Sequence, residues 1–262
     1  SGLTEGVYEL EWTVSNGVCP VVKDSILINI YDIPKSIVGN NLELCEENLA
    51  QITANVNAGT STGVWNLINA PNIPNIVNPN SSTTSVVNLI EGVYEIEWVV
   101  SNGICPAARD TLIISNNPKP NVSFVANLIG VCEQECIDFT NTSTITNPDT
   151  NTSYYWNFGD GQFSANENPT VCFNNNGEYN VSLKVTSNNN CLDSLTNTNY
   201  ITIYPIPQAY FSITPSSDIT NYQMITVNDG SINGDFYYYD FGNGTNTTDK
   251  NPSFFYADTG NY

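Results

Sequence analysis

Alternating hydrophobic and polar positions mark the segment from residue 92 to residue 101. Glu95 and Glu97 stand between hydrophobic side chains that share the opposite face, namely Tyr94, Ile96, Trp98 and Val100. Successive side chains of an extended chain point to opposite sides, so the pattern predicts a β-strand with one buried face. Asn102-Gly103 then favours a hairpin turn, and a returning strand is expected over residues 110–115.

This hairpin pattern occurs twice. The segment 3–28 returns 86 positions later, as the spacing of Trp12 and Trp98 shows. The aligned pairs include Gly6 with Gly92, Tyr8 with Tyr94, and Cys19 with Cys105. Because the first copy begins inside the pattern, the earlier strands of its domain are expected upstream of Ser1.

A different repeat occupies the later half of the chain. Trp156-Asn157-Phe158-Gly159-Asp160-Gly161 places two aromatic side chains on one face of a strand and then enters a glycine-rich turn. The segment Tyr239-Asp240-Phe241-Gly242-Asn243-Gly244 lies 83 positions later. Further signals keep this offset: Asn168-Pro169 with Asn251-Pro252, Gly177 with Gly260, and Tyr179 with Tyr262.

These spaced signals resemble the polycystic-kidney-disease (PKD) domain, whose hallmark is Trp-Asp-Phe-Gly-Asp-Gly followed by Asn-Pro and Gly-x-Tyr. The sequence departs from that pattern at Asn157, Tyr239 and Asn243. Gly92-x-Tyr94 is similar to the tyrosine corner of immunoglobulin-like (Ig-like) sandwiches, in which the tyrosine hydroxyl binds upstream backbone. Both resemblances imply β-sandwich domains.

The predicted fold class is therefore all-β, with elongated tandem Ig-like and PKD-like sandwiches. The predicted domains are the C-terminal part of an Ig-like domain (1–33), a complete Ig-like sandwich (34–117), a PKD-like sandwich (118–207) and a C-terminally truncated PKD-like domain (208–262). Pro118-Lys119-Pro120 is interpreted as a short linker.

Composition narrows the possible partners. With 6 Lys and Arg against 26 Asp and Glu, the net charge of -20 argues against binding to nucleic-acid phosphates or acidic membrane surfaces. No apolar run is long enough for a membrane span, so direct membrane insertion is not expected. Hydrophobic residues make up 40% of the chain, which favours folded cores over disorder.

Seven cysteines occur in a chain without histidine. Disulfides in an oxidising, extracellular setting are favoured over metal binding. Cys45 and Cys105 are the only cysteines of segment 34–117, and closing that loop would stabilise it by about 4 kcal/mol, so a Cys45–Cys105 pair is expected. The repeat places the partner of Cys19 upstream of the sequence, with a free buried thiol as the alternative.

Four further cysteines lie in the PKD-like segment. Cys132 and Cys136 are about 13 Å apart in an extended strand, too far to bridge each other. Similar domains of bacterial surface proteins join an early cysteine to one in the last hairpin. That resemblance implies the pairs Cys132–Cys191 and Cys136–Cys172, and a four-thiolate zinc site is the alternative.

Several acidic and aromatic residues are further candidates for a binding or catalytic site. Asp160 and Asp240 are weak calcium candidates, with turn capping as the favoured interpretation, and no other cofactor is expected. Glu9 with Glu11, and Glu95 with Glu97, could be read as the paired carboxylates of a glycosidase. Each pair lies on one side of a predicted strand, so a solvent-facing sheet face is the favoured interpretation. Of the exposed aromatic candidates Tyr237, Tyr238 and Tyr239, at least two are expected to reach a core or an interface.

The sequence thus predicts a non-enzymatic, extracellular cell-surface segment that serves as a spacer or stalk. It resembles parts of large adhesins that Bacteroidota export through the type IX secretion system. The expected partners are neighbouring repeats of the same polypeptide, with other surface proteins, glycans or self-assembly into a filament as further possibilities. The alternatives are a carbohydrate- or protein-binding module and an accessory region of a secreted hydrolase.

Overall fold

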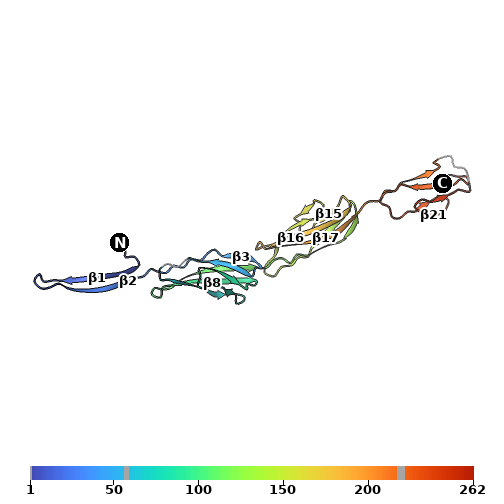
Figure 1. The fold of residues 1–262 in the computed structure, drawn as a ribbon. Coiled ribbons are helices and arrows are strands. Elements are labelled where there is room, and N and C mark those ends of the chain that lie inside the picture. Colours follow the sequence, from blue (N-terminus) through green and yellow to red (C-terminus); the bar gives the residue numbers. More distant parts are fainter. Residues whose placement is uncertain (1, 56–58, 217–221) are drawn as a thin grey trace. The chain divides into compact units, whose positions relative to one another are not determined.

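The computed structural model describes residues 2–55, 59–216 and 222–262. Within these residues the regular structure consists of β-strands, as Figure 1 shows, and the all-β prediction is confirmed. No helix in the described ranges is both long and apolar enough to cross a membrane.

Contacts divide the chain into two compact units. The first contains Ser1–Asn121, Ser143–Ser153 and Val185–Asp193. The second contains Val122–Thr142, Tyr154–Lys184 and Ser194–Tyr262. The domain limits proposed from the sequence, at residues 33, 117 and 207, remain predictions.

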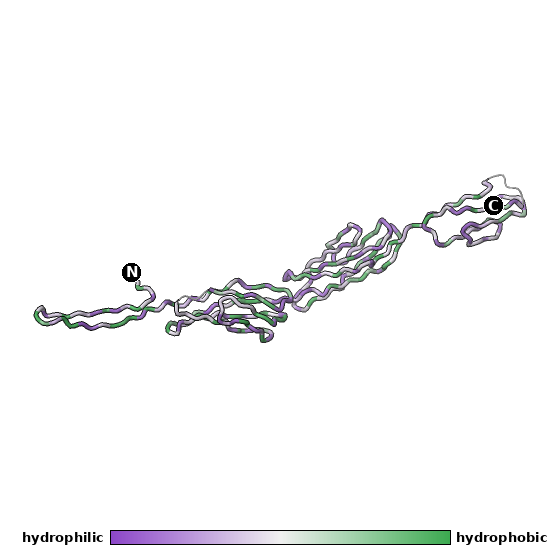
Figure 2. Tube along the Cα trace, viewed as in Figure 1, coloured by the Kyte–Doolittle hydropathy of each residue, from purple (hydrophilic) through white to green (hydrophobic). Residues whose placement is uncertain are grey.

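The chain begins with a two-stranded antiparallel sheet of β1 (Gly6–Val14) and β2 (Val22–Ile30). Its register places Trp12 opposite Asp24 and Leu10 opposite Ile26. Hydrophobic positions run along both strands in Figure 2, and most of their side chains are exposed.

The first sandwich packs a four-stranded sheet, in the order β3-β9-β8-β5, against a three-stranded sheet, in the order β4-β7-β6. β3 pairs parallel to β9, whereas β8 pairs antiparallel to both β5 and β9. The strands are β3 (Leu42–Cys45), β4 (Leu49–Thr53), β5 (Thr62–Asn69), β6 (Asn75–Ile76), β7 (Thr83–Val87), β8 (Gly92–Ser101) and β9 (Ala108–Asn117).

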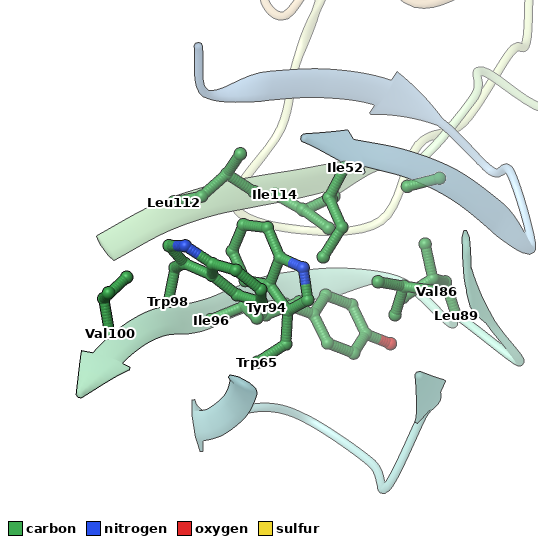
Figure 3. Packing of buried hydrophobic residues seen from close by; sticks show 11 residues of the cluster. Ile52, Trp65, Val86, Leu89, Tyr94, Ile96, Trp98, Val100, Leu112 and Ile114 are labelled. Carbon is green, nitrogen blue, oxygen red and sulfur yellow. The ribbon is translucent and has the colours of Figure 1, made fainter. Parts of the chain in front are cut away.

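Two tryptophans centre the core of this sandwich. Figure 3 shows Trp65 of β5 beside Trp98 of β8, with ring centroids 4.9 Å apart. The side chains that alternate along β8 are buried with them, as the sequence pattern predicts: Tyr94, Ile96, Trp98 and Val100. Gly63 leaves space for this arrangement, because a Cβ atom there would overlap the Trp98 indole.

The second sandwich combines sheets in the orders β10-β12-β15 and β11-β17-β16-β13-β14. Trp156 and Phe158 are buried and pack with Phe139, as expected for the aromatic strand end. The strands are β10 (Phe124–Ala126), β11 (Gly130–Cys132), β12 (Cys136–Asn141), β13 (Asn151–Asn157), β14 (Phe163–Ser164), β15 (Thr170–Cys172), β16 (Gly177–Ser187) and β17 (Leu192–Tyr204).

The last segment forms a three-stranded sheet, β18-β19-β22, and a two-stranded sheet, β20-β21. Its aromatic strand end, Tyr239 and Phe241, corresponds to Trp156 and Phe158 of the second sandwich. The strands are β18 (Phe211–Thr214), β19 (Ile225–Asp229), β20 (Tyr239–Asp240), β21 (Asn246–Thr247) and β22 (Ser253–Phe254).

Candidate functional site

Two disulfides define the cysteine chemistry. Cys136 of β12 and Cys172 of β15 are direct partners in the antiparallel register, and the structure joins them, which is the pair that the sequence resemblance implied. The other bond joins Cys45 to Cys191, and it replaces two expected pairs.

The Cys45–Cys105 prediction is wrong because the two residues lie at opposite ends of β9. Cys45 is the register partner of Asn117, the last residue of that strand, whereas Cys105 lies in the hairpin before its first residue. Ten residues at about 3.3 Å each separate these ends by roughly 30 Å. Bridged Cα atoms lie within about 7 Å.

The Cys132–Cys191 prediction fails for the same reason. Cys132 pairs with Tyr204 at the end of β17, whereas Cys191 immediately precedes that strand. A strand of thirteen residues separates them. The bonded cysteines also leave no four-thiolate set for the zinc alternative.

The Cys45–Cys191 bond lies among polar contacts. Cys191 follows β16 in the hairpin, and its sulfur is fully buried against β3 and the end of β9. Asn189 of the same hairpin donates to Asp149 Oδ1 at 2.9 Å and to Asn117 Oδ1 at 3.3 Å. The final hairpin of the second sandwich is thus fixed to the end of the first by one covalent bond and by the hydrogen bond from Asn189 to Asn117, while the bond to Asp149 holds Asn189 within the second sandwich.

Three thiols are free in the structure: Cys19, Cys105 and Cys132. Cys19 and Cys132 are exposed, and Cys105 is half-buried. The expected upstream partner of Cys19 remains a prediction.

The two calcium candidates act as turn caps. Asp160 Oδ1 accepts the Gln162 N–H at 2.9 Å, and Asp240 Oδ1 accepts the Gly242 N–H at 2.9 Å. The repeat equivalents Asn243 and Asn157 accept the matching bonds at 3.0 and 2.9 Å. At each turn position, an Asn amide oxygen in one repeat therefore accepts the same backbone hydrogen bond as an Asp carboxylate oxygen in the other.

Gly159 shows why the turn needs glycine. Its φ of +80° favours glycine, and a Cβ atom would lie 2.6 Å from the Asn180 carbonyl oxygen. Gly242 has a matching φ of +73°. Among the described residues no group of three or more Cys, Asp or Glu side chains could hold a metal ion.

One glutamate of each pair forms an ion pair across its hairpin. Glu97 contacts Arg109, and Glu11 contacts Lys23 at 2.8 Å. These contacts join neighbouring strands, so the structure gives the carboxylates a place on a sheet face rather than in a cleft.

The tyrosine run divides as the sequence predicts. Tyr237 and Tyr239 are half-buried, and their hydroxyls donate to Gly234 O at 2.6 Å and Lys250 O at 3.2 Å. Tyr238 is 60% exposed.

An apolar groove of about 620 Å³ lies in the last segment, lined in part by Phe211, Val227 and Phe254. Tyr239 and Phe241 also line it, and their equivalents in the second sandwich, Trp156 and Phe158, are fully buried core residues. The groove is therefore lined by residues whose repeat equivalents form a sandwich core, and the repeat pattern in the sequence identified two of them, Tyr239 and Phe241.

Comparisons with known proteins agree with this architecture. Residues 117–203 match the family model described as PKD domain. This match and the Ig-like fold of the neighbours support an arrangement of tandem PKD- and Ig-like repeats. Such domains are typically non-catalytic modules, and together with the disulfides they indicate an extracellular protein.

Three solved structures illustrate the similarity. The PKD1 domain of Vibrio anguillarum Epp is 27% identical over 34% of this chain and 99% of its own, with a TM-score of 0.30. The PKD1 domain of the Vibrio cholerae metalloprotease PrtV is 28% identical over 32% of this chain and 98% of its own, with a TM-score of 0.28. The N-terminal eight Ig domains of Down Syndrome Cell Adhesion Molecule isoform 1.30.30 are 15% identical, with a TM-score of 0.55. That match covers 89% of this chain and 32% of the other, and it supports the sandwich fold alone.

Proposed function

We propose that this chain is a spacer segment of a large secreted cell-surface adhesin. Its consecutive sandwiches hold a distal binding module away from the cell, and its immediate partners are neighbouring repeats of the same polypeptide. The resemblance noted in the sequence favours the adhesins that Bacteroidota export by type IX secretion.

The observation that carries this proposal is the Cys45–Cys191 bond. Cys45 lies on an early strand of the first sandwich, and Cys191 lies in the final hairpin of the next one. The bond closes a sequence separation of 146 residues, which in the chain-entropy treatment stabilises the folded state by on the order of 5 kcal/mol. A covalent tie between successive modules limits bending at their junction, which a spacer needs and a catalytic site does not.

The remaining candidate sites support the same function. The turn carboxylates of Asp160 and Asp240 cap backbone amides, and Glu11 and Glu97 bind basic side chains on neighbouring strands. The candidate polar residues from the sequence thus stabilise turns and strand pairs of the sandwiches. A net charge of -20 also disfavours lateral collapse of neighbouring chains through self-repulsion.

A replacement experiment tests the spacer function. In the full-length protein, residues 34–207 are exchanged for two unrelated β-sandwich domains of similar total length, and a second variant lacks the segment. A spacer predicts that adhesion survives the exchange and falls on deletion. Loss of adhesion in both variants would show that the segment itself recognises a ligand, and the proposal would fail.

A further inference from the structure

We propose that Cys105 and Cys132 are half-sites of two further interdomain clamps, built like the one that Cys45 and Cys191 close. In each clamp an early-strand cysteine of one sandwich is bonded to the final-hairpin cysteine of the next. Cys132 would take the hairpin cysteine of a following sandwich, and Cys105 the early-strand cysteine of a preceding one. This inference rests on the proposed spacer function and specifies how its repeats are joined.

Cys45 and Cys132 occupy the same structural position. Each ends a short strand that pairs parallel to the last strand of its own sandwich, opposite Asn117 or Tyr204. The residue after each cysteine makes the same backbone hydrogen bond. The Glu46 N–H donates to Asn117 O at 3.0 Å, and the Glu133 N–H donates to Tyr204 O at 3.0 Å.

The likeness extends into the linkers. Glu46 Oε1 accepts the Lys119 N–H at 3.1 Å, and Glu133 Oε2 accepts the Ile206 N–H at 3.4 Å. Lys119 and Ile206 are the central residues of matching Pro-x-Pro segments, 118–120 and 205–207. The junction that carries bonded Cys45 and the junction that carries free Cys132 are therefore built from the same contacts.

The hairpin cysteines are equivalent as well. Cys19, Cys105 and Cys191 are spaced by 86 residues, and each follows a Ser-Asn pair that begins four positions earlier. The Cys105 N–H donates to Asn102 Oδ1 at 2.9 Å, and the Cys19 N–H donates to Asn16 Oδ1 at 2.8 Å. In the bonded copy, the Cys191 N–H donates to Ser187 Oγ at 3.2 Å.

The hairpin of Cys105 already contacts the linker that precedes its own sandwich. Asn102 Nδ2 donates to Asp32 O at 2.8 Å, two residues before Pro34. The hairpin of Cys191 also contacts the chain that precedes its own sandwich, through a different asparagine, since Asn189 Nδ2 donates to Asn117 Oδ1. Asn117 is also the register partner of Cys45, so such a contact marks where the preceding sandwich presents its early-strand cysteine.

Closing a clamp is an ordinary thiol–disulfide exchange. One cysteine thiolate attacks a low-molecular-weight disulfide such as oxidised glutathione and releases one reduced thiol. The second cysteine thiolate then attacks the mixed disulfide, forms the protein disulfide and releases the other reduced thiol. The two protein thiols are thereby oxidised, their protons pass to solvent, and the glutathione disulfide is reduced.

An extended chain tests the Cys132 half-site. Because Tyr262 aligns with Tyr179, a second copy of residues 180–207 is appended after Tyr262, which supplies a final hairpin with its own copy of Cys191. After refolding with oxidised and reduced glutathione, non-reducing peptide mapping should link Cys132 to the appended cysteine. Cys132 should change from fully alkylated by iodoacetamide to protected.

A matched control carries serine at the appended cysteine and should leave Cys132 alkylated. Alkylation of Cys132 in the extended chain, with its appended strands protected from proteolysis, would overturn the inference. If the appended strands are not protected, the deciding measurement is a peptide map of the native full-length protein, purified in iodoacetamide. There, Cys132 and Cys105 must each be linked to a cysteine of another sandwich, and a free thiol or an intradomain pair at either position overturns the inference.

The 262-residue chain provides an independent check. Cys45→Ser should leave Cys191 as a free thiol that iodoacetamide labels once the protein is unfolded under non-reducing conditions, while Cys105 and Cys132 also remain free, because neither lies near Cys191. A new Cys105–Cys191 or Cys132–Cys191 bond would contradict the assigned positions. These peptide maps report on the disulfide links alone. They can overturn the clamp inference while the replacement experiment still supports a spacer, and the replacement experiment can overturn the spacer function while the maps still show the clamps.

Discussion

The hairpins β1–β2 and β8–β9 have almost the same sequence pattern but opposite environments. Trp98 is fully buried, whereas its equivalent Trp12 is 72% exposed. Ile96 is fully buried, whereas its equivalent Leu10 is 56% exposed. Both hairpins keep the same antiparallel pairing, with each tryptophan opposite an aspartate.

The two hairpins share their local pattern and turn chemistry, and they differ in the second layer that covers the apolar face of β8. The apolar face of β8 is covered by Ile52 and Val86 of the opposite sheet, and Trp65 of the neighbouring strand β5 packs beside Trp98 in the same core cluster (Figure 3). In the described part of the chain, β1 pairs with β2 alone. A strand therefore gains most of its stability from the partner that covers its apolar face.

The largest expected contrast is between the two tryptophans. Trp98→Ala should destabilise the first sandwich by about 3–5 kcal/mol, because it removes a buried indole from the core. Trp12→Ala should leave that sandwich unchanged. Urea unfolding, followed by hydrogen exchange of β8 and β9 peptides, measures both. If both substitutions lowered the unfolding free energy of the first sandwich equally, the contrast between the two tryptophans would be wrong.

A refinement uses the Trp98 indole nitrogen, which is buried and has no hydrogen-bond partner among the described residues. Trp98→Phe should cost less than Trp98→Ala, since it removes this unpaired donor and keeps most of the ring.

The tyrosine corners should give an intermediate contrast. The Tyr94 hydroxyl accepts the Ile90 N–H at 2.7 Å and donates to Asn72 Oδ1 at 2.6 Å, and its side chain is fully buried. Tyr94→Phe should therefore cost about 1–2 kcal/mol by leaving these groups unsatisfied. The Tyr8 hydroxyl donates to Thr4 O at 2.9 Å near solvent, and Tyr8→Phe should have little effect in the same unfolding assay.

The ion pairs should give a smaller contrast. Glu97→Gln should weaken the first sandwich by roughly 0.5 kcal/mol, because its partner Arg109 is largely exposed. Glu11→Gln should matter less, since both Glu11 and Lys23 are exposed. Measuring the Glu97→Gln effect at low and high salt checks its origin, because a screened ion pair predicts that the difference shrinks in salt.

The smallest expected effect is that of calcium removal. Asp160 and Asp240 already cap turn amides, so chelation should leave the melting temperature unchanged, and Asp160→Asn should behave like the wild type. Scanning calorimetry with and without chelator tests this. A chelator-dependent melting shift that Asp160→Asn abolishes would instead establish a calcium site.

The disulfides show where prediction from sequence stopped. Cys136 and Cys172 face each other across one strand pair of the second sandwich. Cys45 and Cys105 also belong to one sandwich, yet β9 separates them along its whole length. Cysteine counting within a domain does not show at which end of a strand each thiol lies.

The sequence by itself determined the strands, the repeat registers and which face of each strand is apolar, because side-chain alternation and turn residues act over a few neighbouring positions. Tyr94 and Trp98 could be assigned to a core, and Asp160 to a turn, on that basis. Only the tertiary structure decided which side chains cover the apolar face of β8 and which sandwiches are joined. Those outcomes depend on contacts such as Ile52 with the core around Trp98, made by packing between sheets, and Cys45 with Cys191, made between repeats.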